Sequence, residues 1–237
     1  MKRIAHRGNM SSDQKNIENT LQAFSNALSA VDGIELDVHM TRDGILVVFH
    51  DNEINRLTDG QGNLLDLDYD YIRTLRVNGE KIPTLEEVFS IMPFDKQIYI
   101  EIKQCERYGQ YGKYPGIVPK VILLIEKYNL ESQSIIISFD WYLLLESKEI
   151  NKNIKTGALL DENLMLTEFN TLNCCNTRCI KRLKIIDIDY LIFDYRLLIK
   201  QKHFIPNNKW SLGFWYTKGT ILNFSSQTIK IIISDDW

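Results

Sequence analysis

The chain has 237 residues, with 28 lysines and arginines against 31 aspartates and glutamates, and a net charge of −3. This balance argues against a nucleic-acid partner, because a phosphate backbone selects basic surfaces. No apolar run reaches the roughly 20 residues that cross a bilayer, and the start, MKRIAHRGN, has no apolar signal-peptide region. We therefore expect a cytoplasmic protein with no transmembrane segment.

Eight strand-like runs recur along the chain, with helical or polar stretches between them. In order they are RIAHRG (3–8), GIELDVHM (33–40), QIYIEIK (97–103), SIIISFD (134–140), IKTGALL (154–160), YLIFDYRLL (190–198), KWSLGFWY (209–216) and IKIIISDD (229–236). Apolar residues at helical spacing predict helices within 19–31, 84–92 and 116–130. We expect Asn19, with Gln22, to cap the first helix and Thr84, with Glu87, to cap the second.

This alternation of strand and helix is typical of a parallel sheet that is buried on both faces. Eight such units favour a TIM (β/α)8 barrel over a doubly wound sheet, and no glycine-rich nucleotide loop follows the first strand. No repeat or linker divides the chain, so we predict one domain over residues 1–237.

The second strand carries two acids inside an apolar run. Because side chains alternate along a strand, Glu35, Asp37 and His39 share one face. In a barrel strand that face points inward, where two carboxylates would repel each other and lose their hydration, and a divalent cation would remove both penalties. An edge strand with its polar face in water fits this segment equally well.

Two further strands favour the barrel interpretation. In QIYIEIK, Tyr99, Glu101 and Lys103 share a face, which adds a third carboxylate and a group that could bind an anion. Three carboxylates favour Mg²⁺ or Ca²⁺ over zinc. His6 and Arg7 end the first strand, at the side of a barrel that carries the chemistry. Read alone, this pair fits a solvated surface, whereas beside the acids it supplies a titratable group and a phosphate binder.

The dipeptide Asp43-Gly44 predicts a hairpin after the second strand. With a two-residue loop, Arg42 would pair with Ile45 and Asp37 would lie directly opposite His50. Two histidines, three acids, an arginine and a lysine would then meet at one barrel mouth. Phosphodiester cleavage is the reaction class that suits these groups.

The four cysteines do not add a second site. Cys105 is isolated, and CCNTRC groups Cys174, Cys175 and Cys179 without an evident fourth ligand nearby. We therefore expect thiols here and no zinc site.

The sequence resembles the glycerophosphodiester phosphodiesterase family of the phospholipase C-like phosphodiesterase superfamily. The resemblance rests on IAHRG (4–8), ENT (18–20), IELDVHMTRDGILVVFHD (34–51), RLTDG (56–60), IPTLEEVF (82–89) and YIEIK (99–103). It implies a TIM barrel with a small insertion after the second strand, here about residues 51–83. It also implies one divalent cation, Mg²⁺, Ca²⁺ or Mn²⁺, and hydrolysis of glycerophosphodiesters, such as glycerophosphocholine or glycerophosphoethanolamine, to glycerol 3-phosphate and an alcohol.

The resemblance also implies a role for eight residues. Glu35, Asp37 and Glu101 would bind the metal, and His6 and His50 would act as acid and base. Arg7 and Lys103 would contact the phosphate, and Trp215 would line the pocket near the glycerol or leaving group. The chain departs from the family in three ways. Tyr216 replaces a usual threonine, Tyr99 stands where many members have asparagine, and the last helix is missing after the eighth strand. A homo-oligomer could cover the flank which that helix would occupy.

Two other functions stay open on the sequence. A phosphodiesterase similar to sphingomyelinase D or lysophospholipase D shares the histidine–arginine pair and the two acids of the second strand, but such proteins are typically secreted and disulfide-bonded. A non-catalytic barrel that binds a phosphate ligand would have no need of both histidines and all three acids.

Overall fold

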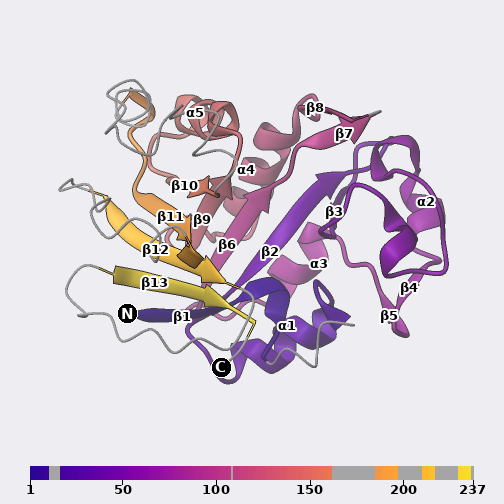
Figure 1. The fold of residues 1–237 in the computed structure, drawn as a ribbon, viewed down its shortest axis with the longest axis horizontal. Coiled ribbons are helices and arrows are strands. Elements are labelled where there is room, and N and C mark those ends of the chain that lie inside the picture. The colour runs from indigo at the N-terminus through magenta and orange to yellow at the C-terminus, as the bar shows by residue number, and fades with distance from the viewer. Residues whose placement is uncertain (11–16, 108, 162–184, 197–209, 217–228, 236–237) are drawn as a thin grey trace.

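The computed structural model of the chain describes residues 1–10, 17–107, 109–161, 185–196, 210–216 and 229–235. Figure 1 shows these residues as a curved set of strands with helices along part of it and a smaller lobe to one side. Among the described helices, none has the length and apolar content needed to cross a bilayer. Cys174, Cys175 and Cys179 lie outside the described residues, so the prediction about their thiols stays a prediction.

Eight parallel strands hydrogen-bond side by side and close into a barrel. They are β1 (Lys2–Ala5), β2 (Gly33–Met40), β6 (Gln97–Ile102), β9 (Ser134–Ser138), β10 (Lys155–Leu160), β11 (Tyr190–Asp194), β12 (Ser211–Tyr216) and β13 (Ile229–Ser234). β1 pairs with both β13 and β2, and this double pairing closes the ring. The predicted TIM barrel is thus confirmed. Seven of these strands lie within the runs predicted for them, and β1 begins one residue before its run, at Lys2.

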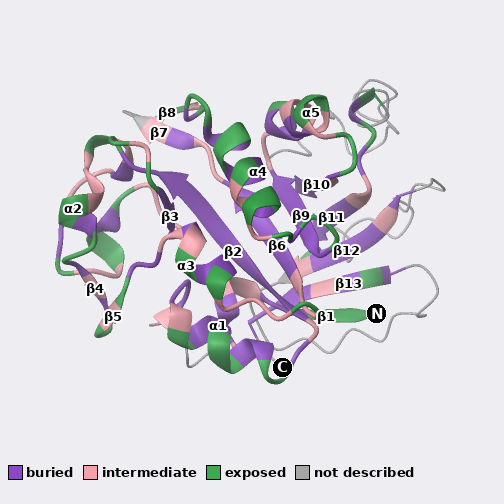
Figure 2. Cartoon of the chain, turned by 180° about the vertical axis from the view of Figure 1, so that it is seen from behind, coloured by how far each residue is buried: buried purple, intermediate pink, exposed green. Residues whose placement is uncertain are grey.

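Four helices cover the outer faces of the first five of these strands. They are α1 (Leu21–Leu28), α3 (Leu85–Ser90), α4 (Ile117–Lys127) and α5 (Trp141–Ile150). The outward residues of the strands, such as Leu36 and Ile100, form one continuous apolar core with inward helix residues such as Val121. Figure 2 shows this arrangement as buried strands beneath helices whose outer sides are exposed.

The start of α3 is as predicted, whereas the start of α1 is not. Thr84 and Glu87 form the expected capping box. At α1 the cap is Thr20, whose side chain accepts a hydrogen bond from the Ala23 amide, so the prediction of Asn19 as the cap is wrong. Asn19 instead has a left-handed φ of 59°, a conformation that asparagine tolerates better than most residues. This conformation turns its side chain toward the barrel.

A second apolar cluster fills the barrel interior. It consists of Ile4, Tyr99, Ile135, Ile137, Leu159, Ile192, Ile231 and Ile233. These residues alternate along the strands with those of the outer core, as the pleat requires. Tyr99, where many family members have asparagine, is fully buried there and donates its hydroxyl to Gln97 Oε1 at 3.1 Å. It therefore fills the floor of the barrel.

The chain between β2 and β6 builds the smaller lobe. Its remaining elements are β3 (Leu46–Val48), η3 (Ile54–Arg56), η4 (Leu64–Asp66), α2 (Tyr69–Ile72), β4 (Arg76–Val77) and β5 (Glu80–Lys81). It has an apolar cluster of its own, which includes Ile54, Leu64 and Ile72. That this segment is an insertion that caps the barrel stays a prediction.

A hairpin that follows β6 lies against this lobe. Its strands are β7 (Cys105–Arg107) and β8 (Gln110–Gly112). Asn52 accepts a hydrogen bond from the Glu106 amide at 3.0 Å, and Asn63 donates one to the Glu106 carbonyl at 2.7 Å. These two bonds attach the hairpin to the lobe near the end of β6.

Candidate active site

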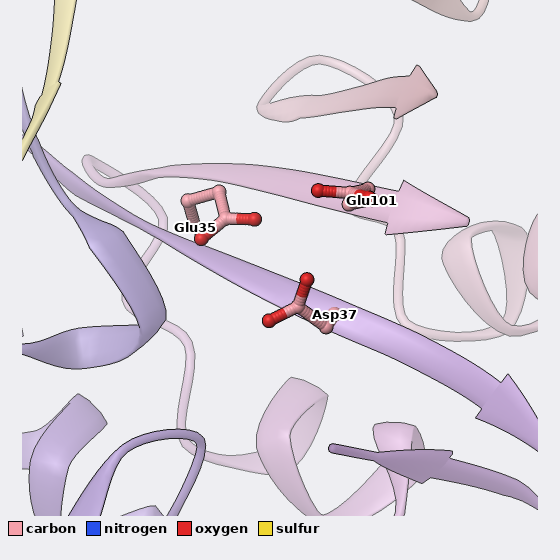
Figure 3. Close-up of side chains that lie close together, drawn as sticks. All are labelled: Glu35, Asp37 and Glu101. Atoms are coloured by element: carbon pink, nitrogen blue, oxygen red, sulfur yellow. The ribbon is translucent and has the colours of Figure 1, made fainter. Parts of the chain in front are cut away.

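Three acidic side chains meet inside the barrel where β2 and β6 run side by side. Asp37 pairs with Glu101 in the register of the two strands, and Glu35 precedes Asp37 on the same face of β2. Their carboxylate oxygens lie within 4.8 Å of one another, and all three residues are buried. Figure 3 shows the three carboxylate groups turned toward one space. The structure thus brings together the residues that the sequence predicted as metal ligands.

Basic and amide groups compensate part of this negative charge. Lys103 Nζ lies 2.8 Å from Glu101 Oε1 and 3.3 Å from Asp37 Oδ1, and Arg7 Nε lies 3.5 Å from Asp37 Oδ2. Burial alone would raise the pKa of Asp37, but Lys103, His50 and Arg7 together with a hydrogen bond from Asn19 hold it far below its usual range. Asp37 is therefore ionised.

Glu35 is not compensated to the same degree. Burial, and next the charges of Asp37 and Glu101, raise the pKa of Glu35 well above its usual value, although the Arg7 amide donates to Glu35 Oε2 at 3.0 Å. Asp37 Oδ1, also buried, accepts no hydrogen bond from any residue that the structure describes. A buried carboxylate whose pKa is raised by two acidic neighbours fits a cation bound between the three groups. Because all the ligand atoms would be carboxylate oxygens, the site suits Mg²⁺ or Ca²⁺.

His6 stands at the mouth of the barrel beside this cluster. It begins a short 3₁₀ turn, η1 (His6–Gly8), in which Arg7 has a left-handed φ of 55°. His6 Nδ1 lies 2.8 Å from Asp235 Oδ1, and Nε2 lies 3.9 Å from Glu35 Oε2. The contact with Asp235, just after β13, orients the ring so that Nε2 faces the carboxylates.

His50 reaches the same place by a different geometry from the one predicted. β2 and β3 pair Val38 with Val48 and Met40 with Leu46, so the loop is one residue longer than expected. The Phe49 amide donates to the Asp37 carbonyl, so the predicted pairing of Asp37 with His50 is wrong. His50 follows the last paired residue, where the alternation of β3 no longer fixes the direction of a side chain.

A small cavity joins the predicted residues. Its volume is about 70 Å³, and its polar wall consists of His6, Arg7, Glu35, His50, Glu101 and Lys103. Its apolar wall consists of Ile137, Phe139, Leu159, Trp215 and Ile233. Seven of the eight predicted site residues therefore line one cavity. The eighth, Asp37, does not line it but contacts two residues that do, Glu101 and Lys103.

Trp215 completes the apolar side of this cavity. Its ring meets Phe139 edge to face, with centroids 6.1 Å apart. Its buried Nε1 has no hydrogen-bond partner within the described part of the chain. The indole can therefore offer a donor to a hydroxyl group of a bound molecule.

A wider cleft of about 1020 Å³ opens beside the cavity. His50, Glu101, Lys103 and Phe139 line both spaces, and the β7–β8 hairpin adds Glu106 and Tyr111 to the wider one. A phosphodiester has two arms, and these connected spaces can hold one arm each.

Four residues of the site carry roles that the sequence analysis did not assign. They are Glu18, Asn19, Asp51 and Asp235, which contact Arg7, Asp37, His50 and His6 respectively. Asn19 Nδ2 donates to Asp37 Oδ2 at 2.8 Å. Glu18, Asn19 and Asp51 lie in segments that carried the resemblance, and Asp235 follows the last strand. Each predicted functional group therefore has a polar partner that holds it in place. Polar residues next to the motifs, such as Glu18 and Asp51, were candidates for this role.

The comparisons with known proteins point in one direction. The sequence pattern of the glycerophosphoryl diester phosphodiesterase family matches residues 6–182. A glycerophosphodiester phosphodiesterase from Caldanaerobacter subterraneus subsp. tengcongensis is 42% identical over 167 residues, which cover 66% of this chain and 65% of that protein. The chain spans about half to two thirds of the length of the curated relatives that it matches.

Solved structures are similar over nearly the whole chain. The glycerophosphodiester phosphodiesterase from Thermotoga maritima superposes with a TM-score of 0.70 at 26% identity, covering 100% of this chain and 95% of that one. A phosphodiesterase from Oleispira antarctica, solved in complex with the product sn-glycerol-3-phosphate, gives a TM-score of 0.74 at 20% identity and covers 99% and 93% of the two chains.

Proposed function

The chain belongs to the glycerophosphoryl diester phosphodiesterase family, and from this premise we propose that it is a metal-dependent phosphodiesterase. It would hydrolyse glycerophosphodiesters, such as glycerophosphocholine or glycerophosphoethanolamine, to glycerol 3-phosphate and an alcohol. One observation carries the proposal. Three buried carboxylates within 4.8 Å of one another lie beside a cavity that is lined by two histidines, an arginine and a lysine. The product bound by the Oleispira antarctica protein is the one expected here.

Glu35, Asp37 and Glu101 would hold one divalent cation. When bound, it would act as a Lewis acid that offsets charge on the phosphate oxygens. Arg7 and Lys103 would contact the same phosphate, since both line the cavity and both already neutralise the acids around it.

His6 and His50 would move the protons of the reaction. One histidine accepts the proton of the attacking oxygen as the new P–O bond forms, and the other donates a proton to the leaving alcohol as its P–O bond breaks. The attacking group is either water, which gives glycerol 3-phosphate directly, or the glycerol's own 2-hydroxyl, which gives a cyclic phosphate that water then opens. Each ring has its Nδ1 beside a carboxylate, Asp235 for His6 and Asp51 for His50. That contact would favour a proton on Nδ1 and leave Nε2 for the reaction. Trp215 would contact the glycerol or the leaving group.

Several finer features belong to this proposal as predictions. They are the choice of Mg²⁺ or Ca²⁺ as the ion, a role in glycerophospholipid metabolism, a homo-oligomeric state and a cytoplasmic location. Elemental analysis, light scattering and cell fractionation would test the ion, the oligomer and the location in turn.

The purified protein can be tested directly. With Mg²⁺, Ca²⁺ or Mn²⁺ present, glycerophosphocholine and glycerophosphoethanolamine should release glycerol 3-phosphate. A preference for lysophosphatidylcholine or sphingomyelin would favour the lysophospholipase D or sphingomyelinase D reaction instead. Binding of glycerol 3-phosphate without turnover of any glycerophosphodiester would identify a binding protein.

A further inference from the structure

Arg56 lies outside the predicted site and contacts two of the carboxylates that support it. It is the last residue of η3, in the smaller lobe between β2 and β6. Its Nη2 donates to Glu18 Oε1 at 2.7 Å and to Asp51 Oδ1 at 3.2 Å, and its Nε donates to Asp51 Oδ2 at 2.5 Å. One guanidinium group therefore joins two acidic residues that lie 33 positions apart in the sequence.

Each of these acidic residues holds a different group of the cavity. Asp51 Oδ1 lies 2.6 Å from His50 Nδ1, and Glu18 Oε1 accepts a hydrogen bond from Arg7 Nη1 at 3.0 Å. The contacts form one continuous chain that runs from His50 through Asp51, Arg56 and Glu18 to Arg7. A proton-transfer group and a phosphate-binding group thus share a single anchor.

Because Glu18 is buried, the loss of one of its cationic partners would be costly. Glu18 is only 4% exposed, and its Oε1 serves two guanidinium groups. Without Arg56, Glu18 would lose one of its two cationic partners, and Asp51 would lose its bidentate partner. Burial tends to raise the pKa of Asp51, yet hydrogen bonds from His50 and Arg56 hold it well below its usual range. The planar fork of arginine allows this double contact, and the single ammonium group of lysine does not.

We propose that Arg56 is a positioning residue that fixes the orientation of His50 through Asp51 and that of Arg7 through Glu18. The inference rests on the proposed function, because it treats His50 and Arg7 as groups of one reaction. It also gives the smaller lobe a role in the reaction, because Arg56, which contacts both Asp51 and Glu18, belongs to η3 of that lobe. An exposed ion pair elsewhere in the same lobe, Arg42 with Asp68, has no such connection and serves as the matched comparison.

The test compares Arg56→Ala, Arg56→Lys and Arg42→Ala with the wild type. We expect Arg56→Ala to lower kcat on the order of 10- to 100-fold, as small misplacements of reacting groups do. Arg56→Lys should recover only part of the loss, and added guanidinium should partly rescue Arg56→Ala. Arg42→Ala should keep the wild-type kcat.

A double-mutant cycle separates positioning from a general loss of structure. In a His50→Ala background, Arg56→Ala should cost less than it does alone, because the part of its effect that acts through His50 is already lost and only the part that acts through Arg7 remains. An equal cost in both backgrounds, or a wild-type kcat in Arg56→Ala, would overturn the proposal.

A spectroscopic measurement keeps the inference testable if the wild type turns over no glycerophosphodiester. The ¹⁵N resonance of His50 Nδ1 should shift in Arg56→Ala and stay unchanged in Arg42→Ala, whatever the reaction is. An inactive wild type would refute the proposed function alone, whereas an unshifted His50 resonance would refute the positioning role.

Discussion

Two parts of the barrel interior differ sharply although their strands have the same geometry. We call the part formed by β2 and β6 the acidic arc, and the part formed by β9, β10 and β13 the apolar arc. β2 and β6 turn Glu35 and Glu101 toward the cavity, whereas β9, β10 and β13 turn Ile137, Leu159 and Ile233 toward it. The alternation of side chains is the same in both arcs. What differs is the support, because the acidic arc needs charged and amide partners and the apolar arc needs only close packing.

The partners of the acidic arc come mainly from outside its own strands. Arg7 and Asn19 come from the segment after β1, and Lys103 follows the last residue of β6. These residues compensate Asp37, whose pKa lies far below its usual range, more than Glu35, whose pKa lies well above it. The acidic arc therefore depends on charged and amide partners from neighbouring segments, and Glu35 is the acid that these partners compensate least.

Removal of the divalent cation should have the largest effect. Turnover should fall on the order of 1,000-fold, since the ion contributes several kcal/mol to charge stabilisation. Release of glycerol 3-phosphate after chelation and dialysis measures the loss, and titration with Mg²⁺ should restore it. Full turnover in protein shown to be metal-free would contradict this role for Glu35, Asp37 and Glu101.

The two histidines beside the acidic arc should come next. His6→Ala and His50→Ala should each lower kcat by on the order of 100-fold or more, because each removes a proton-transfer group. Metal affinity, measured by calorimetry, should stay close to the wild type and serves as the control. A variant with normal turnover would remove that histidine from the mechanism.

A cavity in the apolar arc should affect stability without affecting metal binding. Ile135 is fully buried among the interior residues of the barrel, and Ile135→Ala should lower the free energy of unfolding by about 2–5 kcal/mol. Urea denaturation measures the change, and the conservative Ile135→Val should cost about 1 kcal/mol. A large loss of Mg²⁺ affinity in Ile135→Ala would show that the two arcs are not independent.

The amide that supports Asp37 should have a smaller effect on metal binding. Asn19→Ala removes the hydrogen bond to Asp37 Oδ2 and should weaken metal affinity about 10- to 100-fold, as loss of an outer partner of a ligand does. Asn19→Gly loses the same bond but accepts the left-handed φ of 59° at no steric cost. The two variants should therefore bind Mg²⁺ alike, with Asn19→Gly the more stable. Wild-type affinity in both would exclude Asn19 as a support of the site.

Sequence patterns predicted the strands well because the alternation of apolar residues is a local signal. They predicted the acidic arc for the same reason, since Glu35, Asp37 and Glu101 lie on two strands of strong periodicity. The hairpin register was wrong because the loop after Thr41 has one more residue than Asp43-Gly44 suggests. His50 still reaches the cavity, since pairing in β3 ends before it.

The supporting contacts could not be read from spacing. His6 and Asp235 are 229 residues apart, and only closure of β1 against β13 brings them together. Asn19 was predicted as a helix cap because its chemistry suits one, and the competing demand of Asp37 becomes visible only in three dimensions. Partners of buried charges depend on tertiary structure, whereas the charges themselves are visible in the strand pattern.

A cap on the outer layer should have the smallest effect and should leave both arcs unchanged. Thr84 accepts a hydrogen bond from the Glu87 amide at 3.1 Å, and Thr84→Ala should lower the free energy of unfolding by about 1 kcal/mol. Thr84→Ser keeps the hydroxyl and should lose much less. Because α3 lies outside the barrel, kcat and metal affinity should match the wild type in both variants. A fall in kcat on loss of this cap would mean that the outer layer positions the acidic arc, and that the arc depends on more than the contacts within the barrel mouth.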